Sequence, residues 1–479
     1  MSLRLAELLP RNHRTRAAGM LAGIVVVAAC APVGPDYHRP AVDLPSAYPA
    51  DAAKQDKAPL PKRNSWWTIY HDSELDGLMR QALADNLDLQ QAVARIEEAD
   101  ANLRIAGSAF LPEVDFGTTG THSKSSTRNA NSQFIPQAVQ DRLHFALSTS
   151  FEIDFWGKYR RAREAARAEA LGTRYARDTV ELSMTSLIAD TYFSLRSLDV
   201  QIAVTQRTLK SRNETLDLVR KQLHSGIATD LDVNQALDSQ ATAASQLKSL
   251  KQQRALAEHQ LGLLTGHPDL TVAPSSGDLD TLPVPPIPPV GLPSSLLTRR
   301  PDVRQAEQAL ISANAQIGVA RAAMFPNISL TGSLGTESAE LATLLASGAD
   351  IWSIGYALTL PIFDGGRLKA ATDVKVAQMK QSLAAYQKSA QSAFREVADA
   401  LTTAETAAAQ EKDLATRVKA NTNALRIAQA RYRSGYSSFL EVLDAQRSLN
   451  DAQLAYINNR QTRLTANVDL IKALGGGWN

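Results

Sequence analysis

The sequence has little of what several common protein classes need. Cys30 is the only cysteine, so the chain cannot form an intramolecular disulfide. The net charge is only +2, which gives no strong attraction for nucleic acid. The apolar run "MLAGIVVVAA" (20–29) is too short to span a bilayer as a helix. These shortages exclude a disulfide-stabilised fold and argue against a nucleic-acid partner.

Motifs for catalysis are also missing from the sequence. The eight histidines are scattered without the spacing of metal ligands, and no G-x-S-x-G, H-E-x-x-H or phosphate-binding glycine-rich motif occurs. We therefore predict no enzymatic activity, no catalytic residues and no metal site.

The N-terminus has the pattern of a bacterial export signal. Basic residues Arg11, Arg14 and Arg16 precede the apolar run, and Cys30 follows it directly. The end of the run, "VAAC", resembles a lipobox, which implies cleavage before Cys30 and attachment of N-palmitoyl and S-diacylglycerol groups to it. In that pattern Ala31, rather than Asp, implies sorting to the outer membrane. The alternative is an ordinary buried cysteine.

Proline is absent from two long stretches, between Pro136 and Pro268 and after Pro361. Within these stretches, residues 158–225 and 366–434 are rich in Ala, Gln, Arg, Leu and Glu. This composition predicts two helices of about 100 Å each, far longer than globular helices. Apolar residues recur at three- or four-residue steps in the second stretch, so one side of that helix must pack on other helices. A soluble coiled coil is the alternative.

Four segments alternate between apolar and polar residues with period two. They are residues 113–120, 144–156, 327–335 and 352–363. Period two predicts strands with one apolar and one polar face. The segments form two hairpins with polar loops at 121–137 and 336–348, a pattern that suits a transmembrane barrel. A soluble sandwich is the alternative, but it leaves the polar faces without partners.

The two halves of the chain align segment by segment. Pro112 aligns with Pro326, and Gly226 aligns with Gly435. Each half reads as helix, strand hairpin, long helix, turn and helix, so the chain is a tandem duplication. The predicted organisation is a signal peptide (1–29), an irregular segment (30–71), a first repeat (72–266), a proline-rich linker (267–292) and a second repeat (293–479). The strand hairpins are 112–155 and 326–363, and the helical hairpins are 157–265 and 365–475.

Four strands cannot close a barrel by themselves. Open strand edges cannot face lipid, because unpaired backbone groups cost several kcal/mol there. Two chains would supply eight strands and a filled interior, whereas three would supply twelve and an aqueous lumen. Polar residues such as Ser148, Ser150 and Thr359 on one face favour water inside, and therefore a homotrimer.

The duplication, the lipobox, the following "VGPDYHRP" and the second turn "SGYSSFLEVLDAQR" together resemble the TolC-type outer-membrane factors. More narrowly, they resemble the NodT-like lipoproteins of tripartite RND efflux systems. The resemblance covers essentially the whole mature chain. It implies a trimeric, twelve-stranded barrel in outer-membrane lipid, continued by a periplasmic helical barrel. It also implies a periplasmic adaptor (membrane fusion) protein and an inner-membrane RND pump as partners, with a passive duct exporting small molecules.

The resemblance also places a gate at the second turn. Leu440 and Asp444 match the apolar and acidic gate positions of the family, and Glu441 matches a position that is acidic in only some members. Three copies of Asp444 around one axis would repel one another and attract cations. The glycines Gly226 and Gly435 permit the tight turns with positive φ.

Other residues near the turns have two interpretations. Arg431, Tyr432 and Arg433 precede the second turn and are candidates for holding adjacent hairpins together. Asp230 and Asp232 follow the first turn, where they either assist the gate or act as ordinary helix caps. The cap alternative applies to Glu441 as well.

Two alternative functions remain open from the sequence. TolC-type channels also serve type I protein secretion, so a duct for protein export is one alternative. From a different class, the chain would be a structural lipoprotein that only spans the periplasm.

Overall fold

The computed structural model describes residues 32–48, 63–124, 139–275, 284 and 293–477. In chain order its helices and strands are η2 (Arg63–Tyr70), α2 (Ser73–Asp85), α3 (Leu87–Ser108), β1 (Glu113–Lys124), β2 (Val139–Ile153), α4 (Lys158–His224), α5 (Asp230–Thr265), η4 (Pro293–Ser295), α6 (Leu296–Arg299), α7 (Pro301–Ala322), β3 (Asn327–Ser338), η5 (Leu341–Thr343), β4 (Asp350–Thr359), α8 (Arg367–Arg433) and α9 (Phe439–Ala473). No helix in these ranges is both long enough and apolar enough to cross a membrane.

The chain divides into two compact units, which we describe separately. The first comprises Met1–Pro40, Glu97–Gly172 and Glu307–Ala385, as far as these are described, and contains the sheet. The second comprises Ala41–Ile96, Thr173–Ala306 and Tyr386–Asn479 and contains the helical hairpins. The helices α4 and α8 have 67 residues each, as the proline-free stretches predicted.

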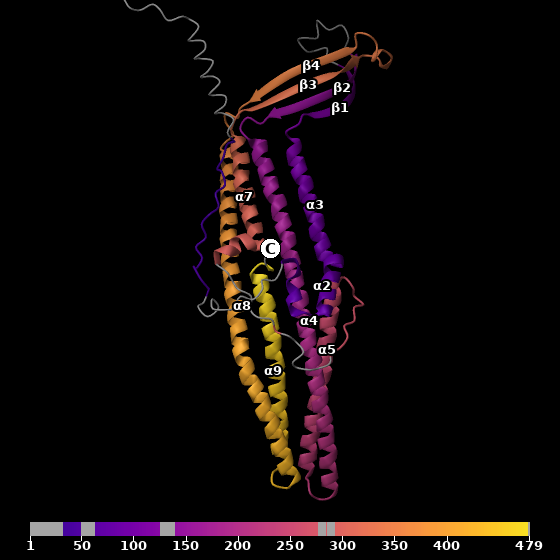
Figure 1. Ribbon diagram of the computed structural model, residues 1–479. Helices are drawn as coiled ribbons and strands as arrows, with labels where there is room; N and C mark the ends of the chain where they lie inside the picture. The colour runs from indigo at the N-terminus through magenta and orange to yellow at the C-terminus, as the bar shows by residue number, and fades with distance from the viewer. Residues whose placement is uncertain (1–31, 49–62, 125–138, 276–283, 285–292, 478–479) are drawn as a thin grey trace, which may run out of the picture. The chain divides into compact units, whose positions relative to one another are not determined.

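In the first unit the four strands form one antiparallel sheet in the order β1-β2-β3-β4 (Figure 1). The register places Phe116, Leu147, Leu334 and Trp352 in one row across all four strands. Residues paired across a sheet share a face, so this row lies on a single side. Phe116 is 67% exposed and Trp352 is 72% exposed, so the single chain leaves this apolar face uncovered. The predicted apolar face is confirmed.

The opposite face of the sheet is polar. The neighbouring row consists of Asp115, Ser148, Ser333 and Ser353, with a 2.7 Å hydrogen bond between the two Oγ atoms of the last pair. Two predicted strand ends need correction, because β2 ends at Ile153 rather than at residue 156, and β4 ends at Thr359 although the alternation continues to residue 363. Proline lacks the N–H that a sheet ladder requires, and Pro361 lies two residues after the end of β4.

The N-terminal segment lies against the helices of the first unit. The Val33 amide donates to the Trp156 carbonyl at 2.9 Å, just before α4. Further along, Gly34 passes close to α7, where a Cβ built on Gly34 would lie 2.6 Å from the Gly318 Cα. Arg161 on α4 donates to Asp36 at 2.6 Å. The segment is therefore held at several points along its length.

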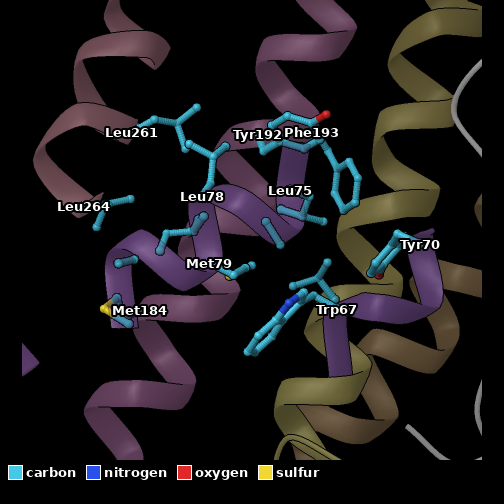
Figure 2. Close-up of a cluster of buried hydrophobic side chains, with 14 of the residues drawn as sticks. Trp67, Tyr70, Leu75, Leu78, Met79, Met184, Tyr192, Phe193, Leu261 and Leu264 are labelled. Carbon is cyan, nitrogen blue, oxygen red and sulfur yellow. The ribbon is translucent and has the colours of Figure 1, made fainter. Parts of the chain in front are cut away.

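The second unit has an aromatic core built by η2, α2, α4 and α5. Figure 2 shows Tyr70 of η2 and Leu75 of α2 close to Phe193 of α4. Asp72 fixes the start of α2 by accepting from the Glu74 amide at 2.9 Å, which caps the helix. The Tyr70 hydroxyl donates to Asn467 of α9 at 2.8 Å, so the C-terminal helix joins the same core.

Candidate functional site

Both helical hairpins turn at a glycine in the left-handed conformation. Gly435 has φ +75° and Gly226 has φ +73°. At the second turn the Tyr436 amide donates to the Arg431 carbonyl at 2.9 Å, and the first turn has the equivalent bond at the same distance. This is the Schellman arrangement, which satisfies carbonyls at a helix end and requires positive φ at the glycine. Repeat-related glycines thus build the same turn twice.

The two hairpins pack together next to these turns. Phe439 and Val442 of α9 are buried against Leu216 and Val219 of α4. The ring of Tyr432 on α8 lies 5.4 Å from that of Phe439. The four helices α4, α5, α8 and α9 therefore share a small apolar core within one chain.

Tyr432 also makes a polar contact across the hairpins. Its hydroxyl donates to Oε1 of Gln222 on α4 at 2.7 Å. Burial, followed by the negative charge of Asp232, raises the pKa of Tyr432 above its usual value. The phenol is consequently neutral at physiological pH and acts as a hydrogen-bond donor.

The arginines on either side of Tyr432 differ in their contacts. Nε of Arg431 lies 4.0 Å from Oε2 of Glu441, and its guanidinium donates to the Tyr436 carbonyl at 3.5 Å. Both charged side chains are about half exposed, so the pair is weak. Arg433 is exposed and has no ion-pair partner among the described residues of the single chain. The Ser438 side chain makes no cap hydrogen bond at the start of α9.

Leu440 and Asp444 lie on the exposed side of α9. Leu440 is 61% exposed despite its apolar side chain. Asp444 accepts from Nη2 of Arg447 at 2.7 Å, one helical turn further on. The sequence interpretation missed Arg447, although a spacing of three residues on a helix brings such side chains together.

The acidic residues of the first turn have a capping role. The Thr229 hydroxyl accepts from the Asp232 amide at 3.3 Å, and Asp232 accepts from the Thr229 amide at 2.8 Å. This reciprocal pair is a capping box. Asp230 lies in the first turn of α5. The first turn also contributes Leu231, which is 65% exposed and corresponds to Leu440 when Gly226 is aligned with Gly435. Sequence reasoning overlooked Leu231.

The two repeats and the long helical hairpins have clear relatives among known proteins. The pattern of the outer membrane efflux protein family matches residues 78–267 and 292–476, which is more than half of the chain. The chain belongs to the outer membrane efflux protein family.

Individual relatives of this outer membrane efflux protein align over almost their whole length. The chain is 35% identical to outer membrane protein OprJ of Pseudomonas aeruginosa, covering 95% of this chain and 94% of OprJ. It is also 35% identical to the toluene efflux pump outer membrane protein TtgC of Pseudomonas putida, over 93% of this chain and 92% of TtgC. Among solved structures, the CmeC outer membrane channel of Campylobacter jejuni superposes with a TM-score of 0.86 at 26% identity, over 94% of this chain and 96% of the CmeC chain.

The protein is therefore a transport protein of the outer membrane. Within the described ranges no group of three or more His, Cys, Asp or Glu side chains is arranged to hold a metal ion. Cys30 lies outside the described residues. The roles of the gate residues and the domain boundaries stay predictions.

Proposed function

We propose that this outer membrane efflux protein is a passive, gated duct formed by three copies of the chain. The observation that carries the proposal is the sheet of the first unit. Its face with Phe116, Leu147, Leu334 and Trp352 is apolar and exposed, while the opposite face is polar. Such a sheet suits lipid on one side and water on the other.

The number of copies follows from the two outer strands. β1 pairs only with β2, and β4 pairs only with β3, among the described residues. Lipid does not tolerate open strand edges, so the edges must pair between copies. Three chains give twelve strands and an open lumen, which the polar face requires, whereas two give eight and a filled interior. The mass of the detergent-solubilised complex tests this number: three chains support the proposal, and two chains contradict it.

The gate in this proposal is the exposed side of α9 near its turn. Leu440 would form an apolar ring and Asp444 an acidic ring around the axis of the trimer. Tyr432 ties the second hairpin to α4 through a single contact with Gln222, and the weak Arg431–Glu441 pair connects α8 to α9 within the second hairpin. A partner that competes for these contacts could therefore open the duct at small cost.

The partners in this proposal are a periplasmic adaptor protein and an inner-membrane RND pump. The relatives named above include a toluene efflux pump outer membrane protein, which supports a small-molecule substrate. The duct supplies no energy, so export must stop when the pump is absent. Accumulation of a fluorescent pump substrate in cells that lack this protein, reversed by the gene, tests the assignment. If these cells accumulate the substrate no more than the wild type does, but no longer release a secreted protein into the medium, type I secretion is supported instead.

Lipidation at Cys30 is part of the same proposal. A Cβ at Gly157 would lie 2.5 Å from Pro32, so the N-terminal segment reaches the end of the sheet. Cys30 is two residues earlier in the chain, which is at most about 7 Å of extended backbone. Acyl chains on Cys30 would therefore enter the membrane beside the barrel. The intact mass of the purified wild-type protein tests this, because it should exceed the mass of the chain from Cys30 to Asn479 by the mass of the acyl groups.

A further inference from the structure

An open hollow of about 520 Å³ lies between α3 and the beginning of α4, in the first unit. It is lined by Leu103, Phe110, Arg160, Arg163, Glu164 and Arg167. The duct and its gate make no use of this hollow. Its lining combines several guanidinium groups with an apolar floor, which is the composition of a site for an anionic amphiphile.

Two of the three arginines in the hollow are available to a ligand. Arg160 is engaged, because its Nε lies 3.3 Å from Oδ2 of Asp154. Arg163 and Arg167 are exposed and have no carboxylate partner among the described residues. The guanidinium carbon of Arg163 lies 5.8 Å from the centre of the Phe110 ring, which holds the charge over the apolar floor.

The single carboxylate in the hollow does not neutralise these charges. Glu164 accepts from Arg161 at 2.8 Å, and the charge of Glu164 is thus shared with an arginine outside the hollow. Arg163 and Arg167 therefore have no carboxylate of their own in the hollow, and the named groups leave a net positive charge. Guanidinium groups form paired hydrogen bonds to phosphate oxygens, so phosphate is the anion that fits this surplus best.

The height of the hollow corresponds to a membrane headgroup layer. Phe110 precedes β1 by three residues, and α4 begins five residues after β2 ends. Arg163 and Arg167 lie five and nine residues into α4, about 8 and 14 Å along its axis. Headgroup layers extend about 5–8 Å beyond the hydrocarbon on each side. If the hydrocarbon ends where α4 begins, Arg163 lies at about the depth of the lipid phosphates, and Arg167 lies one helical turn further from the membrane, from where its long side chain can reach back toward them.

One wall of the hollow is linked to the side of α4 that the N-terminal segment follows. Arg161 connects the two, since it donates both to Glu164 in the hollow wall and to Asp36 of the N-terminal segment at 2.6 Å. The proposed acyl anchor at Cys30 requires this side to face the membrane rather than the lumen. To this extent the inference rests on the proposed function.

We propose that the hollow binds the headgroup of one anionic phospholipid per chain, taken from the inner leaflet of the outer membrane. Arg163 and Arg167 bind the phosphate, and Leu103 and Phe110 pack against the glycerol and the first methylene groups. The apolar floor favours a lipid over a free anion, because inorganic phosphate gains nothing from apolar contact.

Native mass spectrometry of the delipidated trimer, titrated in detergent with dioleoyl phosphatidylglycerol, tests the proposal. We expect up to three bound lipids per trimer and much weaker binding of dioleoyl phosphatidylcholine. The double variant R163Q/R167Q should bind phosphatidylglycerol about 30-fold more weakly, since each surface charge contributes about 1 kcal/mol to lipid attraction. R163K/R167K should fall between the two.

Arg207→Gln is the matched control, because Arg207 is an exposed residue of the same helix about 60 Å further along the axis. It should bind lipid like the wild type. Equal binding of the two lipids, or an unchanged affinity in R163Q/R167Q, would overturn the proposal. Inorganic phosphate that displaces the lipid at equal concentration would overturn the lipid assignment. Trimer mass and channel conductance are measured on the same samples. If both are normal while lipid binding fails, the lipid site is wrong and the duct is not; if both fail, the duct is wrong.

Discussion

The hydroxyl of Tyr432 on α8 donates a 2.7 Å hydrogen bond to Oε1 of Gln222 on α4. The contact joins the two helical hairpins of one chain beside both turns. A Tyr432→Phe substitution removes it and keeps the ring contact with Phe439. We expect the closed state to lose about 1 kcal/mol per contact, which shifts the equilibrium toward open channels roughly fivefold for each of the three contacts that opening breaks. Single-channel open probability measures this shift.

Tyr436→Phe is the control for that substitution. Tyr436 is exposed and lies in the same turn, but its hydroxyl has no hydrogen-bond partner among the described residues. The control should gate like the wild type. If Tyr432→Phe also gates like the wild type, this contact has no role in closing the duct.

The turn glycines should tolerate no side chain without a cost in stability. A Cβ at Gly435 would meet no atom within 4 Å, so the cost of Gly435→Ala is conformational strain at φ +75° alone. Such strain amounts to about 1–2 kcal/mol. Thermal unfolding should show this loss, whereas Gly77→Ala inside α2, also without a neighbour within 4 Å, should stabilise by about 0.5–1 kcal/mol. Equal stability of the two variants would contradict the turn geometry.

Gly318 should be restricted by space rather than by its backbone angle. A Cβ there would lie 2.7 Å from the Val33 carbonyl oxygen and from Cγ of Arg161. We expect Gly318→Ala to push the N-terminal segment off α7, at about 1–3 kcal/mol. Faster proteolysis of that segment in the folded trimer measures the displacement. Gly107→Ala on α3 has open space and should leave proteolysis unchanged.

Asp190 should make the stability of the second unit depend on pH. Burial, followed by the charge of Asp469, raises the pKa of Asp190 to about 7, although Lys472 lowers it in part. Its Oδ1 is buried and lacks a hydrogen-bond partner in the described part of the chain. Because the folded pKa exceeds the unfolded value, Asp190 reduces stability as pH rises from about 4 to 7, and the loss stays constant above.

Replacing that carboxyl with an amide removes this loss. Asp190→Asn should raise stability by roughly 4 kcal/mol at pH 8, and the gain should shrink toward pH 4. Melting temperatures at pH 5 and pH 8 measure the difference. Asp217→Asn, at an exposed site on the same helix, is the matched control for the change from carboxyl to amide. A gain that is larger at pH 5 than at pH 8 would contradict the assignment.

The repeated pattern of the sequence predicted the main elements because each rests on local periodicity. Alternation predicted the two faces of the sheet, and the lack of proline predicted α4 and α8 within a residue or two of their ends. Contacts between distant segments were not predictable in this way. The bond from Tyr432 to Gln222 joins residues 210 positions apart, and no pattern in either helix indicates it.

The candidate gate likewise combines features that local sequence patterns predict with contacts that they do not. Glycine and helix-start signals located both turns, but the choice between gate and cap depended on side-chain direction. Asp232 caps α5 with Thr229, whereas the related Glu441 lies 4.0 Å from Arg431. These two carboxylates have equivalent positions in the repeats, so only the three-dimensional neighbours distinguish them.

The most direct test of the account is single-channel conductance of the purified protein in a planar bilayer, comparing wild type with Asp444→Ala. Asp444 is exposed and, among the described residues, is paired only with Arg447, so its removal should not disturb folding. We predict a small, cation-preferring conductance in the wild type that rises or loses selectivity in the variant. An open pore that is indifferent to the substitution would contradict the gate, and the absence of any pore in either protein would contradict the duct itself.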